Sequence, residues 1–288
     1  MKLATIKLKD KEEGAVISED RATLIQIINE YAGEKWSTNL FELLQTNQLT
    51  DLKNWYKNGG ESRLSHLPTI LAEDTAFAPL YRQPRKICGV GMNYLDKAIE
   101  LSGRPPEAEP IIFMKPDTSL IGPNDSIILP PQANVVTAEA ELAIIIGKTC
   151  KNIDEASASS FVAGFTTAID VTAKDIHANN PRFLQRAKSF DTFFSFGPYF
   201  ITTDEFTHLK DITVETTLNG EVTHRNVVAN MMYPPWFIVS YFSHIMTLHP
   251  GDIILTGTPG SVVIKHGDIV ECQINGFKLL SNSVTRRY

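Results

Sequence analysis

The chain has 288 residues, of which 43% are hydrophobic and 21% are charged, and its formal net charge is −6. These values are typical of a globular protein with room for one large domain and a small one. An acidic chain without clustered Lys and Arg argues against nucleic-acid binding. No apolar run reaches the roughly 18 residues of a membrane span, and no secretion signal is seen, so we expect a cytoplasmic protein.

The three cysteines stand singly inside apolar stretches, at Cys88, Cys150 and Cys272. Their spacing is neither that of a disulfide framework nor that of a metal-binding pair. We therefore expect them to be reduced core residues, and none of them is predicted to be a nucleophile.

Residues 1–80 are predicted to form a small α+β domain with a linker. Strand patterns at 4–9 and 15–18 precede three helical patterns, at 21–33, 38–47 and 49–59. Residues 59–85 are richer in Gly, Pro and polar side chains, as connections are. This unit carries no cluster of chemically active residues, so we expect it to support packing or oligomer formation.

Residues 81–288 are predicted to form the second, larger domain. Many short strand patterns occur here, and Asn219-Gly220 between two of them predicts a β-hairpin. Helical patterns interrupt only at 154–164 and 235–248. The strands follow one another too closely for regular βαβ alternation. The expected fold class is therefore mostly β with a few helices (α+β), with an antiparallel or mixed sheet rolled into a barrel-like core.

One short glycine-containing stretch could suggest a nucleotide-binding loop. Gly89-Val90-Gly91 continues into Met92 without a third glycine. A dinucleotide-binding loop also needs a βαβ context, which the pattern lacks. We expect no nucleotide site here.

Two carboxylates stand where a buried strand is expected. Glu139 and Glu141 flank one alanine, and an unbroken apolar run follows at 142–146. Residues i and i+2 of a strand share a face about 6.6 Å apart, at about 3.3 Å per residue. The two side chains can therefore converge on a hard divalent cation such as Mg²⁺. Taken alone, such a pair also suits a solvated strand end.

Two further residues favour a metal site. Asp170 closes the apolar run 161–169, where a lone carboxylate is costly unless it is paired or binds a cation. Lys188 supplies an ammonium group that could balance an acidic site or hold a substrate oxyanion. Together these residues predict a three-carboxylate site with a lysine nearby.

These residues lie within sequence motifs that resemble those of the fumarylacetoacetate hydrolase family, in the bacterial form with a small N-terminal domain. The resemblance runs from about residue 80 to the end and rests on several motifs in the family's order. These motifs are KICGVGMNYLDKAIE (86–100), PIIFMKP (110–116), EAELAIIIGK (139–148), AIDVTAKD (168–175), AKSFDTF (187–193) and LHPGDIILTGTPG (248–260).

The resemblance implies a β-roll-like core, usually dimeric, and hence a homodimer. It implies Mg²⁺ or Mn²⁺ on Glu139, Glu141 and Asp170, and small 2-oxo or 1,3-dicarbonyl acids as substrates, such as acylpyruvates or oxaloacetate. Lys188 and Thr258 match positions that touch substrate, although the turn around Thr258 also has a purely structural interpretation. A divalent cation stabilises the enolate that forms when a bond beside a carbonyl is cleaved.

The chain departs from the family pattern around the expected site. Family hydrolases carry a histidine paired with a glutamate, whereas here the pair is Lys97 and Glu100. A lysine of ordinary pKa, about 10.4, costs about 4.6 kcal/mol to deprotonate at pH 7. Burial and a cation would lower that cost, so Lys97 is either a base or simply an ion-pair partner of Glu100.

Three other positions differ as well. Lys174 replaces an arginine that grips a carboxylate, and His177 replaces an amide. Both are predicted to bind substrate, with a solvated polar residue as the alternative for His177. Ser195 stands where many members have proline. The segment 104–107 is predicted to be a lid that orders over substrate.

These departures leave several functions open. Hydrolysis and decarboxylation of a small acid are expected about equally, because decarboxylation needs a metal electron sink but no activated water. The alternatives are a keto–enol isomerase of the same fold and a repurposed metal-binding member without turnover.

Overall fold

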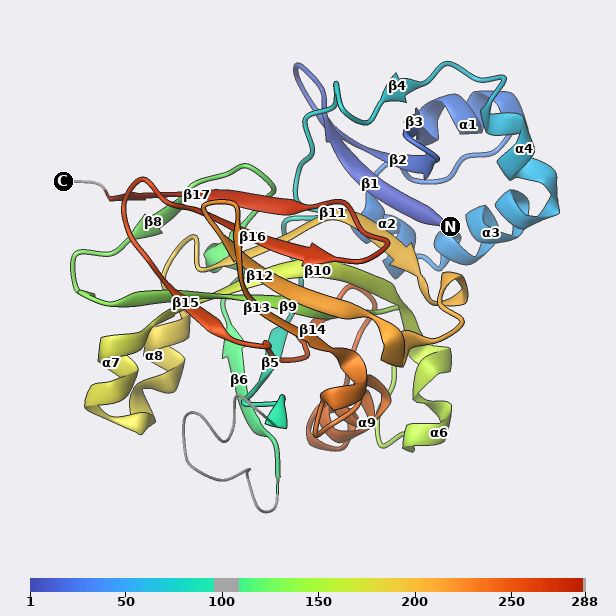
Figure 1. Ribbon diagram of the computed structural model, residues 1–288. Helices are drawn as coiled ribbons and strands as arrows, with labels where there is room; N and C mark the ends of the chain where they lie inside the picture. Colours follow the sequence, from blue (N-terminus) through green and yellow to red (C-terminus); the bar gives the residue numbers. More distant parts are fainter. Residues whose placement is uncertain (96–108, 287–288) are drawn as a thin grey trace.

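The computed structural model describes residues 1–95 and 109–286, and its strands form two sheets (Figure 1). The larger sheet has the order β4-β3-β2-β1-β11-β10-β9-β14-β5-β6, with β15 paired to β9 and β7 to β11. Its strands are β1 (Lys2–Lys7), β2 (Glu12–Ser18), β3 (Arg21–Leu24), β4 (Ile70–Leu71), β5 (Ile87–Gly91), β6 (Ile111–Lys115), β7 (Leu120–Ile121), β9 (Val136–Ile146), β10 (Val162–Ala173), β11 (Phe194–Thr202), β14 (Ile253–Leu255) and β15 (Ser261–Ile264).

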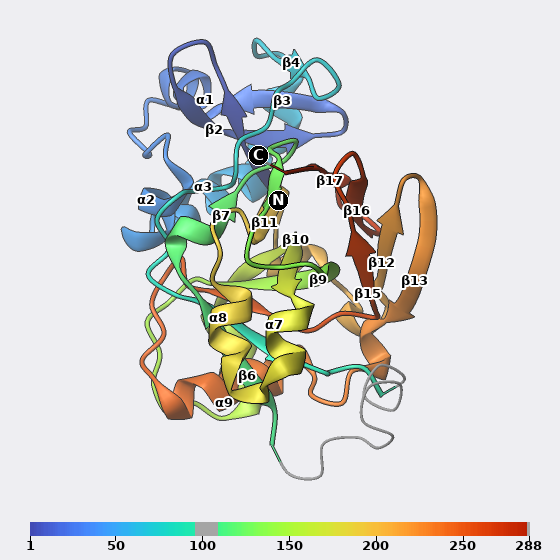
Figure 2. The same ribbon diagram turned by 90° about the vertical axis from the view of Figure 1, so that its left-hand side faces the viewer.

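The smaller sheet has the order β13-β12-β16-β17-β8 and packs on one face of β9 and β10 (Figure 2). Its strands are β8 (Ile127–Leu129), β12 (Thr213–Leu218), β13 (Glu221–Val227), β16 (Ile269–Ile274) and β17 (Leu280–Arg286). The mixture of two packed sheets and peripheral helices confirms the predicted α+β class.

The helices lie around these sheets and are short. They are α1 (Ile25–Ala32), α2 (Leu40–Gln45), α3 (Gln48–Trp55), α4 (Glu61–Leu64), α6 (Glu155–Ala158), α7 (Lys174–Asn179), α8 (Leu184–Lys188) and α9 (Pro235–Ile245). Helices α7 and α8 form a small arm on the side opposite α6 in Figure 1, where they pack against β9, β10 and β6. None of the helices in the described part of the chain is long and apolar enough to cross a membrane.

Strand β9 shows how the sequence pattern sets up the site. Its even-numbered residues, from Val136 to Ile146, all lie in the core shared with the smaller sheet. On the opposite face Ala143 and Ile145 belong to a second apolar core that includes the N-terminal helices. The same face turns polar toward α7, at Glu141, Glu139 and Thr137, and there the strand borders a cavity.

The N-terminal segment continues the larger sheet. Strand β1 pairs antiparallel with β11, and Leu3 lies opposite Phe200. Side chains of α1, α2 and α3 share the second apolar core with β9 and β11. The proposed boundary between residues 80 and 81 stays a prediction.

The β-hairpin predicted at Asn219-Gly220 is confirmed. It joins β12 to β13, and both turn residues have positive φ, 53° and 84°. Such values suit the primed turns that match the twist of a hairpin. The predicted burial of the cysteines is also confirmed, since Cys88, Cys150 and Cys272 are buried and unpaired.

Two helix predictions were partly wrong. Residues 21–24 form β3 because they pair with β2, so the helix starts only at Ile25. The pattern at 154–164 ends its α-helix at Ala158, and Val162 already begins β10. In both places strand pairing in the sheet overrides a local helical pattern.

Gly89 has a packing role within β5. A Cβ atom there would lie 2.2 Å from the Phe113 ring on the neighbouring strand β6. Only glycine therefore leaves room for the Phe113 ring at this position. The stretch Gly89-Val90-Gly91 is a strand and not a nucleotide loop.

Candidate metal and substrate site

A cavity of about 410 Å³ opens where β9 and β10 meet the α7–α8 arm. Glu139, Glu141 and Lys188 lie at its floor, and Phe113 forms part of the apolar wall. Lys174 and His177 reach it from α7. One cavity thus collects residues that are distant in sequence.

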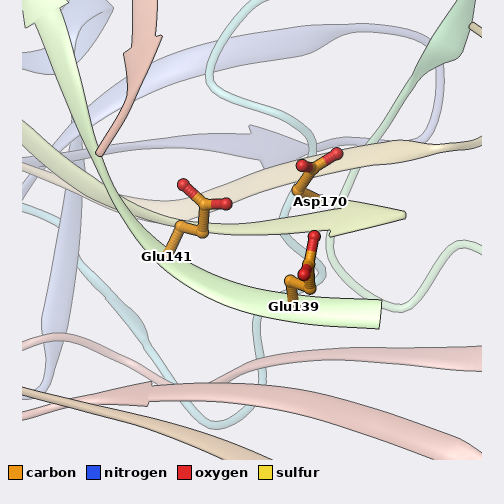
Figure 3. A group of neighbouring side chains, drawn as sticks. All are labelled: Glu139, Glu141 and Asp170. Atoms are coloured by element: carbon orange, nitrogen blue, oxygen red, sulfur yellow. The ribbon is translucent and has the colours of Figure 1, made fainter. Parts of the chain in front are cut away.

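The three carboxylates converge because of strand register. Asp170 on β10 lies directly opposite Glu139 on β9, and Glu141 follows two residues later on the same face. Figure 3 shows the three side chains on one side of these two strands. One oxygen of each lies within 4.8 Å of the others. This spacing is compatible with a single cation bound between them.

Two lysines form ion pairs with two of the three carboxylates, Asp170 and Glu139. Lys115 Nζ donates to Asp170 Oδ1 at 2.7 Å and to the Val171 carbonyl oxygen at 3.1 Å. Lys188 Nζ donates to Asp170 Oδ2 and, at 3.0 Å, to Glu139 Oε2. Asp170 is fully buried, so each of its oxygens has the partner that a buried charge requires.

The charges at the floor perturb one another's pKa values. Burial lowers the pKa of Lys115 to about 8, although Asp170 partly offsets this effect. Burial would also lower the pKa of Lys188, but Asp170 and Glu139 outweigh it and raise that pKa. For Asp170, burial acts to raise the pKa, and the two ammonium groups bring it below its usual value.

A backbone amide of the loop between β14 and β15 binds the Glu141 carboxylate. Between β14 and β15 the chain leaves the sheet, and the Gly257 amide donates to Glu141 Oε2 at 2.6 Å. Gly257 has a φ of 95°, and a Cβ there would lie 2.7 Å from Asn93 Cβ. Burial and then the neighbouring carboxylates Asp170 and Glu139 raise the pKa of Glu141.

Asn93 fixes the loop that carries Gly257. Its side-chain amide donates to the Thr256 and Tyr233 carbonyl oxygens at 2.7 and 2.9 Å, and its Oδ1 accepts from the Tyr233 amide at 2.8 Å. The side chain is fully buried. Three segments therefore meet at Asn93 with every polar atom of its amide used.

The donor set fits a hard divalent cation. Glu139 Oε1 and Glu141 Oε1 accept no hydrogen bond from any residue in 1–95 or 109–286, and both residues line the cavity. Carboxylate oxygens are the ligands that Mg²⁺ and Mn²⁺ prefer. Glu139, Glu141 and Asp170 are therefore the residues that would hold the ion.

Three other predicted residues, Lys174, His177 and Thr258, line the same cavity. Thr258 is buried, and its hydroxyl donates to the Gly260 carbonyl oxygen at 2.9 Å. Lys174 is exposed at the rim, while burial and then Lys188 lower the pKa of His177. The predicted pair Lys97 and Glu100, like the predicted lid at 104–107, lies outside the described residues. The roles of all these residues stay predictions.

Sequence reasoning missed three residues of this site. Lys115 ends a strand pattern inside the motif at 110–116, but its burial depends on α8, which packs against β6. Asn93 lies in the motif at 86–100, and Thr137 lies two residues before the motif at 139–148. A polar residue at the same-face position next to Glu139 was the available signal for Thr137.

Ser195, the departure from a family proline, lies within β11 and is buried. Its hydroxyl donates to the Gly122 carbonyl oxygen at 3.3 Å. Ser195 pairs with Ile169 of β10 inside β11, so a serine at this position is compatible with the strand.

Comparison with known proteins now identifies the family. Residues 86–285 match the family model for the fumarylacetoacetate (FAA) hydrolase C-terminal domain. The chain belongs to the fumarylacetoacetate hydrolase family.

Relatives of this chain carry several different activities in their names. The mitochondrial oxaloacetate tautomerase Fahd2a of Rattus norvegicus is 36% identical over 228 residues, which cover 76% of this chain and 72% of the relative. A solved 5-carboxymethyl-2-hydroxymuconate delta-isomerase from Mycobacterium smegmatis is 31% identical, with a TM-score of 0.77 and full coverage of both chains.

A third similar protein was solved with ligands. The maleylpyruvate hydrolase of Sphingobium sp. SYK-6, in complex with manganese(II) and pyruvate, is 25% identical with a TM-score of 0.81 and full coverage of both chains. This chain is thus an enzyme of a family whose members include hydrolases and isomerases, and its acidic site suits a divalent metal.

Proposed function

We propose that this chain is a Mg²⁺- or Mn²⁺-dependent enzyme that interconverts the keto and enol forms of a small 2-oxo or 1,3-dicarbonyl acid. The observation that carries the proposal is the floor of the cavity, where three carboxylates and Lys188 lie beneath a space that a small acid can enter. A divalent cation bound there would stabilise the negative charge of an enolate.

The protein's own groups suit proton transfer at carbon. The Lys188 ammonium lies between Glu139 and Asp170 and is a fixed donor toward an oxygen that gains charge. The wall beside it is apolar, and Lys188 Nζ lies 4.5 Å from the centre of the Phe113 ring. A preorganised donor of this kind stabilises an enolate more strongly than water does.

Isomerisation is preferred over hydrolysis for two reasons. Lys97 stands where family hydrolases carry the histidine that activates water, and keto–enol exchange needs no activated water. The names of the rat relative and of the Mycobacterium smegmatis structure support the same choice. Lys97 and Glu100 are proposed as the pair that moves the proton. A homodimeric, cytoplasmic enzyme that binds no nucleic acid stays the accompanying prediction.

The test is product analysis with purified protein and Mg²⁺ or Mn²⁺, with and without chelator. Keto–enol exchange of oxaloacetate should accelerate with the metal and leave the mass of the acid unchanged. Loss of CO₂ at the same rate would indicate a decarboxylase, and formation of acetate from acetylpyruvate would indicate a hydrolase. Either result would overturn the isomerase assignment.

A pair of glutamate variants tests the site. Glu139→Ala should abolish both Mn²⁺ binding and turnover. Glu221→Ala, which removes an exposed glutamate from β13, should leave both unchanged. Full metal affinity in Glu139→Ala would contradict the assignment.

A further inference from the structure

The larger sheet has a gap beside the acidic floor. Strand β14 ends at Leu255, which is paired with Ala143 of β9. Strand β15 begins at Ser261, which is paired with Glu139. Between these two pairs the chain leaves the sheet as residues 256–260, called the 256–260 loop below. Because no strand pairs with β9 on this side of the gap, its buried backbone groups there need other partners.

The 256–260 loop brings two groups to the site. The Gly257 amide donates to a carboxylate of the floor, and Thr258 lines the cavity. The first end of the loop is tied to β9, because the amide and the hydroxyl of Thr256 both donate to the Leu142 carbonyl oxygen, at 3.1 and 2.8 Å. The other end, at Gly260, must also be fixed if the two groups are to keep their positions.

Thr216 of the smaller sheet fixes that end. The β12–β13 hairpin lies beside β15 (Figure 2), and Thr216 is fully buried. Its hydroxyl donates to the Gly260 carbonyl oxygen and accepts from the Ala140 amide, each at 3.2 Å. Ala140 stands between Glu139 and Glu141 in the chain. One hydroxyl therefore ties the loop to the part of β9 that carries both glutamates.

His224 contacts the same glycine from β13. It is the cross-strand partner of Thr216, so the two side chains lie on one face of the hairpin. A Cβ atom on Gly260 would lie 2.2 Å from both Cγ and Nδ1 of the imidazole, so the ring covers the Gly260 backbone. The Thr258 hydroxyl donates to the Gly260 carbonyl oxygen and accepts from its amide, at 2.9 and 3.2 Å. Displacement of Gly260 would therefore displace Thr258 as well.

We infer that Thr216 and His224 are positioning residues, which hold the 256–260 loop so that the Gly257 amide stays on Glu141 and Thr258 stays at the cavity. Neither Thr216 nor His224 lines the cavity in the described structure, so both act on the site through the loop. The part of the inference that concerns substrate rests on the proposed function, in which Thr258 contacts the substrate.

Thr216→Val tests the hydroxyl. Valine has the shape of threonine but leaves the Ala140 amide without its partner, so Mn²⁺ affinity, measured from the EPR signal of the free ion, should fall about tenfold. Thr216→Ser keeps the hydroxyl and should bring the affinity back to within about twofold of wild type. The matched control is Thr5→Val in β1, because the Thr5 hydroxyl is also buried and donates to the Leu80 carbonyl oxygen at 2.8 Å. Both valine variants should lower the urea midpoint of unfolding, but Thr5→Val should leave Mn²⁺ affinity unchanged.

A double-mutant cycle tests the imidazole ring. Gly260 does not have a positive φ, and the three atoms nearest to an added Cβ all belong to His224. Gly260→Ala should therefore weaken Mn²⁺ binding about fivefold when His224 is present and less than about twofold in the His224→Ala background.

Three results would overturn the inference. One is a Mn²⁺ affinity of folded Thr216→Val within twofold of wild type, and another is an equal loss of affinity in Thr5→Val. The third is an equal effect of Gly260→Ala in the two His224 backgrounds, which also decides the matter if Thr216→Val does not fold.

Substrate kinetics test the role of Thr258. At saturating Mn²⁺, Thr216→Val should raise KM for oxaloacetate and change kcat by less than about twofold, and an unchanged KM would refute this part. If Mn²⁺ affinity depends on Thr216 but the wild type does not isomerise oxaloacetate, the positioning role stands and the proposed reaction fails. If oxaloacetate is isomerised and Thr216→Val binds Mn²⁺ as the wild type does, the proposed reaction stands and the positioning role fails.

Discussion

The buried contact between Lys115 and Asp170 yields the sharpest stability prediction. Both side chains are fully buried, and their charged atoms are 2.7 Å apart. Lys115→Met keeps the volume of the stem but leaves Asp170 with Lys188 alone and the Val171 carbonyl oxygen without its donor. Breaking a buried ion pair costs about 3–5 kcal/mol. An orphaned carbonyl adds about 1 kcal/mol.

Because Lys188 still holds one oxygen of Asp170, we expect a loss of about 3–4 kcal/mol in the free energy of unfolding. This is a large part of the roughly 5–15 kcal/mol that stabilises a folded protein. Urea unfolding in chelator at pH 7, followed by tryptophan fluorescence, measures it. The double variant Lys115→Met/Asp170→Asn removes both charges and should recover much of the loss.

Lys7 offers a matched control. Its ion pair with Asp125 has a similar N–O distance, 3.1 Å, but both side chains are 34% exposed. Lys7→Met should cost no more than about 1 kcal/mol, because water screens an exposed pair. If Lys115→Met were no more destabilising than Lys7→Met, the argument from burial would be refuted.

Two further results are expected. Gly257→Ala should destabilise the protein and weaken Mn²⁺ binding, because it adds a clash with Asn93 to the strain of a positive φ. Gly220→Ala has open space around it, so it should cost only about 1 kcal/mol of strain and leave Mn²⁺ binding unchanged. Equal effects of the two variants would contradict the clash. In metal-free protein the Lys115 ammonium should titrate near pH 8 by carbon-detected NMR, whereas that of Lys188 should stay charged above the usual lysine range. Because folding lowers the pKa of Lys115, this residue should make the protein more stable as pH rises from about 8 toward the unfolded pKa near 10.4. The difference in unfolding free energy between wild type and Lys115→Met should therefore change over this pH window. A difference that stays constant would refute the prediction.

The carboxylates could be predicted because strand geometry is local. Alternation along one strand places Glu139 and Glu141 on the same face whatever the rest of the fold does. Adding Asp170 required only that its strand lie next to theirs. The hairpin at Asn219-Gly220 could be predicted equally well, because a two-residue hairpin turn needs residues that adopt positive φ.

The compensating charge could not be predicted in the same way. Lys115 ends an edge strand and precedes a proline, a position where a lysine is ordinarily solvated. It is buried because α8 covers it, and α8 is a five-residue helix too short to leave a periodic pattern. Likewise residues 21–24 become a strand only because β2 is available to pair with them.

The two ends of the cavity therefore have different roles. At the floor, Lys115 and Lys188 pair with Asp170 on opposite oxygens, so the acidic cluster is stable as the structure describes it and its open oxygens face the cavity. Changes there affect stability and metal binding together. At the rim, Lys174 is exposed and forms no ion pair with any residue in 1–95 or 109–286, so replacing it should cost little folding stability. If Lys174 binds substrate as proposed, variants at this position should separate substrate binding from folding stability.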